Sequence, residues 1–259
     1  MDFKELIYTK DQGIATITFN RPQSYNSLAR TMIEELVPAV EDCRDDPAVR
    51  VVIITGAGKA FCSGGNLQGA KTHMEQGLKP SSYFLELTKP FHRFITDIRL
   101  LPKPVIAAVN GPAAGAGFSI ALACDLRIVS ERAVFKLAYT SVAALVPDGG
   151  WTIFMPRLVG LGLASELIFL DRPIDAAEAL KLGLVHRVVP DNELAQKAKE
   201  MALQVAAGPA RSLATAKALL NSSMVGILES QLERERLGVG AVSDEPDFRE
   251  AIAAFFEKR

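Results

Sequence analysis

The 259-residue sequence has few cysteines, no long apolar run and no excess of charge of either sign. The three cysteines, Cys43, Cys62 and Cys124, are odd in number and lack the paired spacing of a disulfide framework or a zinc site, which favours a reducing compartment. No apolar run approaches the ~18 residues of a membrane span. The net charge of -1 provides no field that would attract nucleic acid or anionic lipid.

The amino-terminal segment MDFKELIYTK has acidic residues early and none of the apolar stretch that a secretory signal needs. The His, Cys and Asp residues show no metal-ligand spacing, so no metal site is expected. The composition, 49% hydrophobic and 23% charged, is that of a folded protein with a substantial core. We expect a cytoplasmic protein that binds neither membrane nor nucleic acid.

Short β-branched runs alternate with helical periodicity along the first part of the chain. Strands are predicted at residues 14–19, 51–55, 105–109 and 126–129. The run at 51–55 is typical of a strand that is covered on both faces. Apolar residues repeat at three and four positions from Leu28, which predicts an amphipathic helix. The Ala- and Leu-rich residues 118–124 predict a buried one. This succession indicates parallel βα units.

Beyond Pro190 the pattern becomes helical. Helices are predicted at residues 193–206, 209–221, 227–237 and 247–257. We therefore predict an α/β core over residues 1–190 and a helical C-terminal region over residues 191–259.

Two loops of small residues follow two of the predicted strands: residues 59–67 (KAFCSGGNL) and residues 110–118 (NGPAAGAGF). Glycines allow backbone N–H groups to point into a cavity, and a helix starting near Ala116 would direct its positive end there. A tight turn and close packing are the structural alternatives. The glycines do not spell GxGxxG, which argues against dinucleotide binding. Two backbone donors from separate strand ends are what an oxyanion hole requires.

Eight motifs occur in a fixed order along the chain. They are Asn20-Arg21-Pro22 with Asn26, FCSGGNL, KPVIAAVNGPAAGAG, ALACDLRIVS, LVPDGG, MPRLVG, DAAEALKLGLVHRVVP and DFREAIAAFFEKR. Through them nearly the whole sequence resembles the crotonase superfamily, the enoyl-CoA hydratases and isomerases. The resemblance implies a ββα spiral core and an acyl-CoA substrate. It also implies no permanently bound cofactor, coenzyme A entering as part of the substrate, and a homotrimer or homohexamer.

The resemblance places the two oxyanion-binding amides at Gly65 and Ala116. The second is alanine where the best-known hydratases have glycine, and its N–H group survives that change. The resemblance also places coenzyme A along residues 63–68. The residues expected to bind it are Ser63, Gly65, Asn66, Leu67, Gln68 and Ala116.

The sequence departs from the hydratase pattern at the acid and base. Hydratases resembling crotonase use two glutamates, whose positions fall on Ser119 and near Tyr139 or Thr140, and none of these is a carboxylate. Asp148 remains, in a Pro-Asp pair like that of ring-epoxyphenylacetyl-CoA isomerases, where the Asp shuttles a proton between carbons. A carboxylate in an apolar pocket gains basicity that suits this task. Its alternative role is to turn the chain before Gly149.

The histidines and Cys62 are secondary candidates. His73 and His92 lie in a stretch expected to be variable and mobile, and His92 could shuttle protons if it reached the pocket. His186, in GLVHRVV, is expected to be structural. Cys62 lacks a predictable His partner and is expected to pack as a small hydrophobe.

Residues 69–96 are expected to determine the choice of acyl group. The aromatic residues in this segment indicate a bulky or ring-bearing chain: Tyr83, Phe84, Phe91 and Phe94. At the carboxyl end, Ile252, Phe255 and Phe256 suit either a subunit contact or packing within the chain.

We interpret the sequence as an acyl-CoA isomerase that moves a proton through Asp148. An enoyl-CoA hydratase that uses Asp148 and water is the nearest alternative, and a hydrolase or lyase on the same scaffold remains open because fold does not fix function. A non-catalytic acyl-CoA-binding subunit is the alternative of another class. It predicts that binding survives Asp148→Ala and that no substrate turns over.

Overall fold

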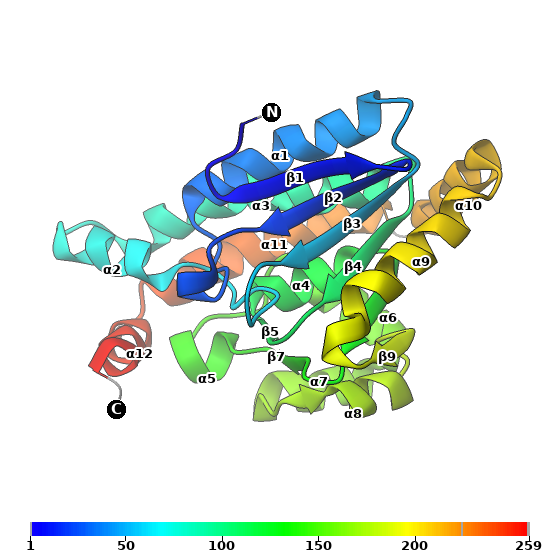
Figure 1. Cartoon of the computed structure of the whole chain (residues 1–259). Coiled ribbons are helices and arrows are strands. Elements are labelled where there is room, and N and C mark those ends of the chain that lie inside the picture. Colours follow the sequence, from blue (N-terminus) through cyan, green and yellow to red (C-terminus); the bar gives the residue numbers. More distant parts are fainter. Residues whose placement is uncertain (1, 224, 258–259) are drawn as a thin grey trace.

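A six-stranded sheet lies at the centre of the computed structural model, which describes residues 2–223 and 225–257. Its strand order is β1-β2-β3-β4-β6-β9 (Figure 1). β1 and β2 form an antiparallel hairpin, and the remaining neighbours are parallel. The strands are β1 (Leu6–Asp11), β2 (Ile14–Phe19), β3 (Val51–Gly56), β4 (Val105–Val109), β6 (Leu126–Ser130) and β9 (Arg187–Val189).

A small second sheet continues from the end of β4. β5 (Ala113–Ala114) pairs in parallel with β7 (Val134–Lys136), and β7 pairs antiparallel with β8 (Ile174–Asp175). The loop after β4 therefore becomes a sheet edge before the next helix begins.

Helices surround both sheets (Figure 1). Those of the first part of the chain are α1 (Arg30–Asp45), α2 (Leu67–Glu75), α3 (Pro80–Leu100), α4 (Ala116–Ala123), α5 (Tyr139–Ala143), α6 (Trp151–Val159), α7 (Leu161–Leu170) and α8 (Ala176–Lys181). Those that follow are α9 (Leu194–Ala206), α10 (Ala210–Ser222), α11 (Val225–Ser243) and α12 (Pro246–Glu257). No helix among the described residues combines the length and apolar composition needed to cross a membrane.

The predicted α/β architecture with a helical C-terminal region is confirmed. Each of the four predicted strands is present, the helix predicted from Leu28 begins at Arg30, and the predicted buried helix is α4. The stretch expected to be mobile is instead largely helical, as α2 and α3. Apolar side chains at helical spacing on α3, such as Phe84, Leu87 and Phe91, are buried in the core and fix that helix in place.

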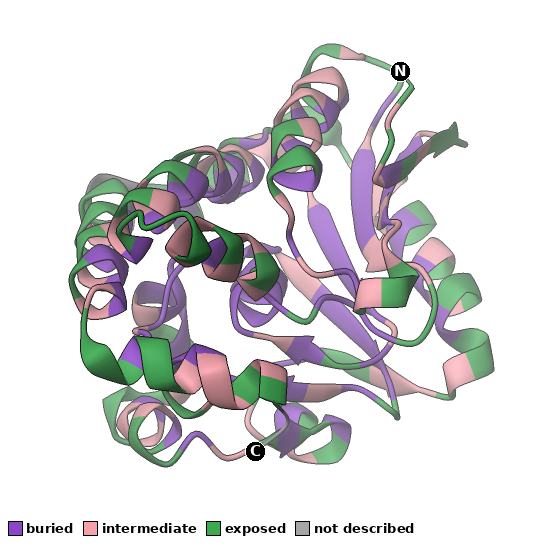
Figure 2. Ribbon diagram, turned by 90° about the vertical axis from the view of Figure 1, so that its left-hand side faces the viewer, coloured by how far each residue is buried: buried purple, intermediate pink, exposed green. Residues whose placement is uncertain are grey.

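Both faces of the large sheet are covered. On one face α1, α3 and α4 contribute to the main core; on the other, Val51, Ile53 and Ile106 pack against α9. Figure 2 shows the strands mostly buried and the outer faces of the helices exposed. The first four residues of β3 are all buried, as predicted for a strand covered on both sides. The division into residues 1–190 and 191–259 stays a prediction.

Backbone hydrogen bonds join the two glycine-containing loops. The Ala114 N–H donates to the carbonyl of Cys62 at 2.9 Å, and the Cys62 N–H donates to the carbonyl of Pro112. Gly117, in the first turn of α4, makes this approach possible, because a Cβ there would lie 2.2 Å from the Cys62 carbonyl oxygen. The loop after β3 and the segment after β4 are thereby held side by side.

We predict that Gly117→Ala destabilises the protein by about 1–3 kcal/mol through overpacking. Gly162 is the matched control, since it also lies in the first turn of a helix, α7, and a Cβ there meets nothing within 4 Å. Gly162→Ala is expected to leave stability unchanged or to raise it by up to about 1 kcal/mol. Urea denaturation measures both; equal midpoints for the two variants would contradict the packing argument.

Candidate active site

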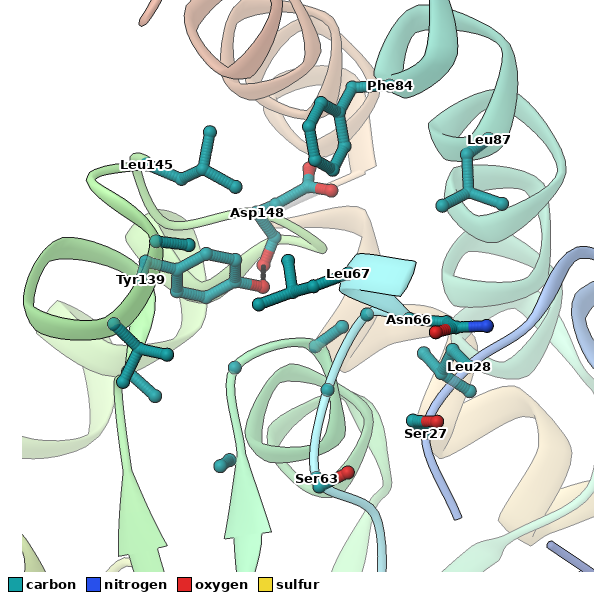
Figure 3. A pocket seen from close by; sticks show the side chains of 18 of the residues that line it. Ser27, Leu28, Ser63, Asn66, Leu67, Phe84, Leu87, Tyr139, Leu145 and Asp148 are labelled. Atoms are coloured by element: carbon teal, nitrogen blue, oxygen red, sulfur yellow. Dashed lines mark hydrogen bonds between the residues drawn. The ribbon is translucent and has the colours of Figure 1, made fainter. Parts of the chain in front are cut away.

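A cavity of about 580 Å³ opens where the two joined loops meet α3, α5 and α12. Its walls are mainly apolar, and Figure 3 shows Asp148 and Tyr139 together on one wall, with the side chain of Leu67 pointing toward them and that of Asn66 pointing away. The cavity brings together every site residue that the sequence predicted: Ser63, Gly65, Asn66, Leu67, Gln68, Ala116 and Asp148.

The amides of Gly65 and Ala116 come from neighbouring backbones. A Cβ on Gly64 would lie 3.0 Å from the carbonyl oxygen of Ala114 and 3.5 Å from the Cα of Gly115, so the two loops are in van der Waals contact. Both Gly65 and Ala116 line the cavity. Within the described chain, neither N–H group donates to a protein acceptor. Two free donors therefore face one space, and the second stands at the N-terminus of the buried helix α4.

The segment expected to bind coenzyme A is fixed at several points. Leu28 and Gly65 form a parallel bridge, with the Leu28 N–H donating to Gly64 and the Asn66 N–H donating to Leu28. The Asn66 side chain accepts from the Gln68 N–H and caps α2. Its backbone carbonyl accepts from the Tyr83 hydroxyl at 3.3 Å. The segment thus presents a defined edge to the cavity.

Asp148 is buried and is the single carboxylate among the described residues that line the cavity. Two hydroxyls hold its backbone: Ser119 Oγ donates to the Asp148 carbonyl at 2.6 Å, and the Tyr139 hydroxyl donates to it at 3.4 Å (dashed in Figure 3). Thr140 is exposed, does not line the cavity and bonds to the carbonyl of Ile168. Of the three residues at the hydratase glutamate positions, two therefore support Asp148.

His92, considered only a secondary candidate, proves to be the nearest partner of the Asp148 carboxylate. Its Nε2 lies 2.5 Å from Asp148 Oδ1, and both side chains are at most 10% exposed. The expectation that His92 lies in a mobile stretch is wrong, since it sits on the packed helix α3. Sequence reasoning could not place it, because the bond spans two elements far apart in the chain.

Glu235, on α11, was not anticipated. Its buried carboxylate accepts the N–H groups of Gly150, at 2.6 Å, and Thr152, at 3.1 Å, together with the Thr152 hydroxyl. These donors belong to the first turn of α6, so Glu235 caps that helix from a distant element. Burial, and secondarily the charge of Asp148, raises the pKa of Glu235 to about 7. Glu235 lies among other charged residues of α11, and nothing in that sequence pattern indicates that it caps α6.

The ligand atoms of His92, Asp148 and Glu235 lie within 4.8 Å of one another, which makes them a possible metal-binding group. The fold assembles this group even though the sequence shows no ligand spacing. The atoms that would bind a metal ion are engaged in hydrogen bonds. His92 Nε2 is bonded to Asp148 Oδ1, and the Glu235 carboxylate accepts from the N–H groups of Gly150 and Thr152. The arrangement fits a hydrogen-bonded cluster better than an ion site.

The remaining candidates take structural positions. Cys62 is fully buried, and desolvation raises its pKa to about 12, so it remains a thiol. His186 Nδ1 accepts the Arg127 N–H and links β6 to β9. Of the four aromatics in residues 69–96, Phe84 and Phe91 line the cavity.

The other two aromatics of residues 69–96 lie elsewhere. Phe94 is buried in the core, and Tyr83 contacts the coenzyme A segment from the outside. At the carboxyl end, Ile252 packs within the chain, whereas Phe255 and Phe256 line the cavity.

Comparison with known proteins matches residues 9–259 to the model of the enoyl-CoA hydratase/isomerase family. The chain is 35% identical to a probable enoyl-CoA hydratase of Rhodobacter capsulatus, covering 100% of this chain and 97% of the relative. It is 34% identical to the 1,2-epoxyphenylacetyl-CoA isomerase of Escherichia coli, covering 96% and 94%. A crystal structure of an enoyl-CoA hydratase from Mycobacterium avium subsp. paratuberculosis matches at 36% identity with a TM-score of 0.89, covering 100% and 98%.

The chain belongs to the enoyl-CoA hydratase/isomerase family. It is therefore an enzyme of acyl-CoA thioesters, and its fold is that of the crotonase superfamily. The names of its relatives include both hydratases and an isomerase, so the family alone does not fix the reaction.

The raised pKa of Glu235 predicts a pH-dependent stability in this family member. The folded state binds the Glu235 proton more tightly than the unfolded chain, so this stabilisation is fully present below pH about 4.5 and is lost as pH rises to about 7. Between pH 5 and pH 8 the wild type should lose about 2–3 kcal/mol of unfolding free energy relative to Glu235→Gln.

Denaturant unfolding at several pH values measures this difference. Glu229→Gln is the matched control, because Glu229 lies on the same helix and is exposed. Its difference from the wild type is expected to be independent of pH. A flat profile for Glu235→Gln as well would show that Glu235 ionises normally.

Proposed function

We propose that this enzyme is an isomerase of an unsaturated or strained acyl-CoA, which moves one proton from carbon to carbon through Asp148. The observation that carries the proposal is that Asp148 is the single carboxylate lining the cavity in the described chain. Addition of water by two carboxylates needs a second one, and Ser119, Tyr139 and Thr140 cannot supply it. The resemblance to ring-epoxyphenylacetyl-CoA isomerases supports the same choice.

The steps balance with a single base. The thioester carbonyl oxygen accepts from the N–H groups of Gly65 and Ala116, which acidifies the neighbouring C–H bonds. The Asp148 carboxylate removes a proton from the acyl chain, and the electron pair moves to the carbonyl oxygen as an enolate. The resulting carboxylic acid returns the proton to another carbon as the enolate collapses. Each amide donor is expected to contribute about 3–4 kcal/mol to the stabilisation of the enolate.

The cavity supports an apolar acyl group as the substrate. Phe84, Phe91 and Leu145 line it beside Asp148, and the coenzyme A part would lie along residues 63–68. Burial of the base among apolar side chains also keeps water away from the enolate, which favours proton return over hydration.

We predict that Asp148→Asn lowers turnover by about 10²- to 10⁴-fold, the usual contribution of a general base, while acyl-CoA binding persists. NMR in deuterated water, with 2-enoyl, 3-enoyl and aromatic acyl-CoAs, follows exchange at the α and γ carbons. Loss of double-bond migration in the variant, together with loss of whatever exchange the wild type shows, supports the isomerase.

Two other results would favour other functions. Water addition to a trans-2-enoyl-CoA by the wild type would identify a hydratase that works with Asp148 and water. Binding of CoA thioesters without exchange or conversion in either protein would identify an acyl-CoA-binding subunit.

We further propose that the chain assembles as a homotrimer or homohexamer. Large apolar side chains are exposed on the single chain: Leu161 at 73%, Phe169 at 81% and Leu170 at 70% on α7, and Leu219 at 68% and Leu220 at 72% on α10. Such side chains are costly to leave in water. Sedimentation equilibrium is expected to give three or six times the chain mass of 28.0 kDa, and a monomer at micromolar concentration would contradict the proposal.

A further inference from the structure

Two buried side chains contact the Asp148 region without lining the cavity. His92 reaches it from α3 and Glu235 from α11, and the ligand atoms of all three residues lie within 4.8 Å of one another. Glu235 is engaged with the first turn of α6. His92 is therefore the group that contacts the carboxylate of Asp148 itself.

The two oxygens of Asp148 have different surroundings. Oδ1 lies 2.5 Å from His92 Nε2, whereas Oδ2 has no hydrogen-bond partner among the described residues. The torsion that orients a carboxylate is broad and soft, so an unpaired carboxylate in a cavity rotates freely. The bond to His92 restricts that rotation and leaves one oxygen available to a substrate.

The proton of this bond belongs to the imidazole. An ionised carboxylate only accepts, so His92 Nε2 must carry the hydrogen while Asp148 acts as a base. The short distance is that of a charge-assisted hydrogen bond. When Oδ2 has taken a proton from the substrate, Nε2–H still donates to Oδ1. His92 therefore has no vacant site at Nε2 for that proton, which must return to the substrate.

We propose that His92 is a positioning residue for the proposed isomerisation: it donates from Nε2 to Asp148 Oδ1, fixes the plane of the carboxylate and keeps the transferred proton on Oδ2. This inference rests on the proposed function of Asp148. Its consequence is that the proton moves from carbon to carbon with little exchange into solvent.

Other charged groups around the pair are already partnered. Glu235 faces Asp148 from α11 and is held by α6, and Tyr139 faces it from α5 through a hydrogen bond to its backbone. Glu233 on α11 forms an ion pair with Arg236 at 2.6 Å.

Lys89 of α3 forms an ion pair with Glu86. Neither this pair nor the pair of Glu233 and Arg236 includes His92 or Asp148, so the direct effect of replacing His92 is the loss of its bond to Asp148.

The experiment compares His92→Leu, which removes the donor, with His92→Gln, whose amide can restore it. His92→Leu is expected to lower kcat by about 10- to 100-fold with little change in KM, because one charge-assisted bond is lost. Washout of substrate deuterium into solvent should increase, because the carboxylate is no longer held in one orientation. His92→Gln is expected to restore both properties substantially.

His186→Leu is the control, because His186 is an exposed histidine that accepts from the backbone N–H of Arg127 in β6 and does not line the cavity. Its kcat and its washout are expected to match the wild type. A His92→Leu enzyme with reduced kcat but unchanged washout, or a His92→Gln enzyme that restores neither property, would assign His92 a merely structural role and overturn the inference. If Asp148→Asn remains active, the proposed function fails instead, so the two failures are distinguishable.

A measurement on the wild type covers the case in which His92→Leu does not fold. The chain has three histidines, so the imidazole ¹⁵N signals can be assigned with His92→Gln. The inference requires that His92 carry a proton at Nε2 over the active pH range. An imidazole protonated at Nδ1 alone would overturn it.

Discussion

The site depends on the backbone contact between the loop after β3 and the loop after β4. Hydrogen bonds between Cys62 and the segment Pro112–Ala114 hold the two loops together, and Gly117 allows the approach because a side chain there would collide with the Cys62 carbonyl. Without this contact the amides of Gly65 and Ala116 would not face one cavity. Parallel strands make the contact possible, since they deliver successive loops to the same edge of the sheet.

A second constraint acts on Asp148, which lies in a buried turn that ends where α6 begins. Gly149 and Gly150 adopt positive φ angles of 69° and 82°, and a Cβ on either would meet an aromatic ring at under 3 Å. Glu235 holds the same turn by capping α6. The chain thus places two carboxylates close together in a low-dielectric region, and the rise in the pKa of Glu235 is the electrostatic cost.

Much of the α/β core and of the cavity lining could be predicted from the sequence, because the residue patterns that specify them are local. The run VVIIT and the small residues around Gly64 and Gly115 specify strand ends and close backbone approach through their own chemistry. The resemblance to the family then placed Asp148. The roles of His92 and Glu235 could not be predicted, since each depends on how α3 and α11 pack against a turn from another part of the chain. The helices α2 and α3 were not predicted, although the helical spacing of Phe84, Leu87 and Phe91 on α3 carries that signal.

The same packing suggests how one scaffold could support a different reaction. The resemblance to crotonase-like hydratases places their two glutamates at Ser119 and near Tyr139 or Thr140. Here both positions carry hydroxyls, and both hydroxyls donate to the backbone carbonyl of Asp148. Under the proposed function, these hydroxyls would support a single acid in place of performing chemistry themselves. The two amides would then stabilise an enolate in either reaction, and the side chains around them would decide whether the enolate meets water or the proton that Asp148 retains.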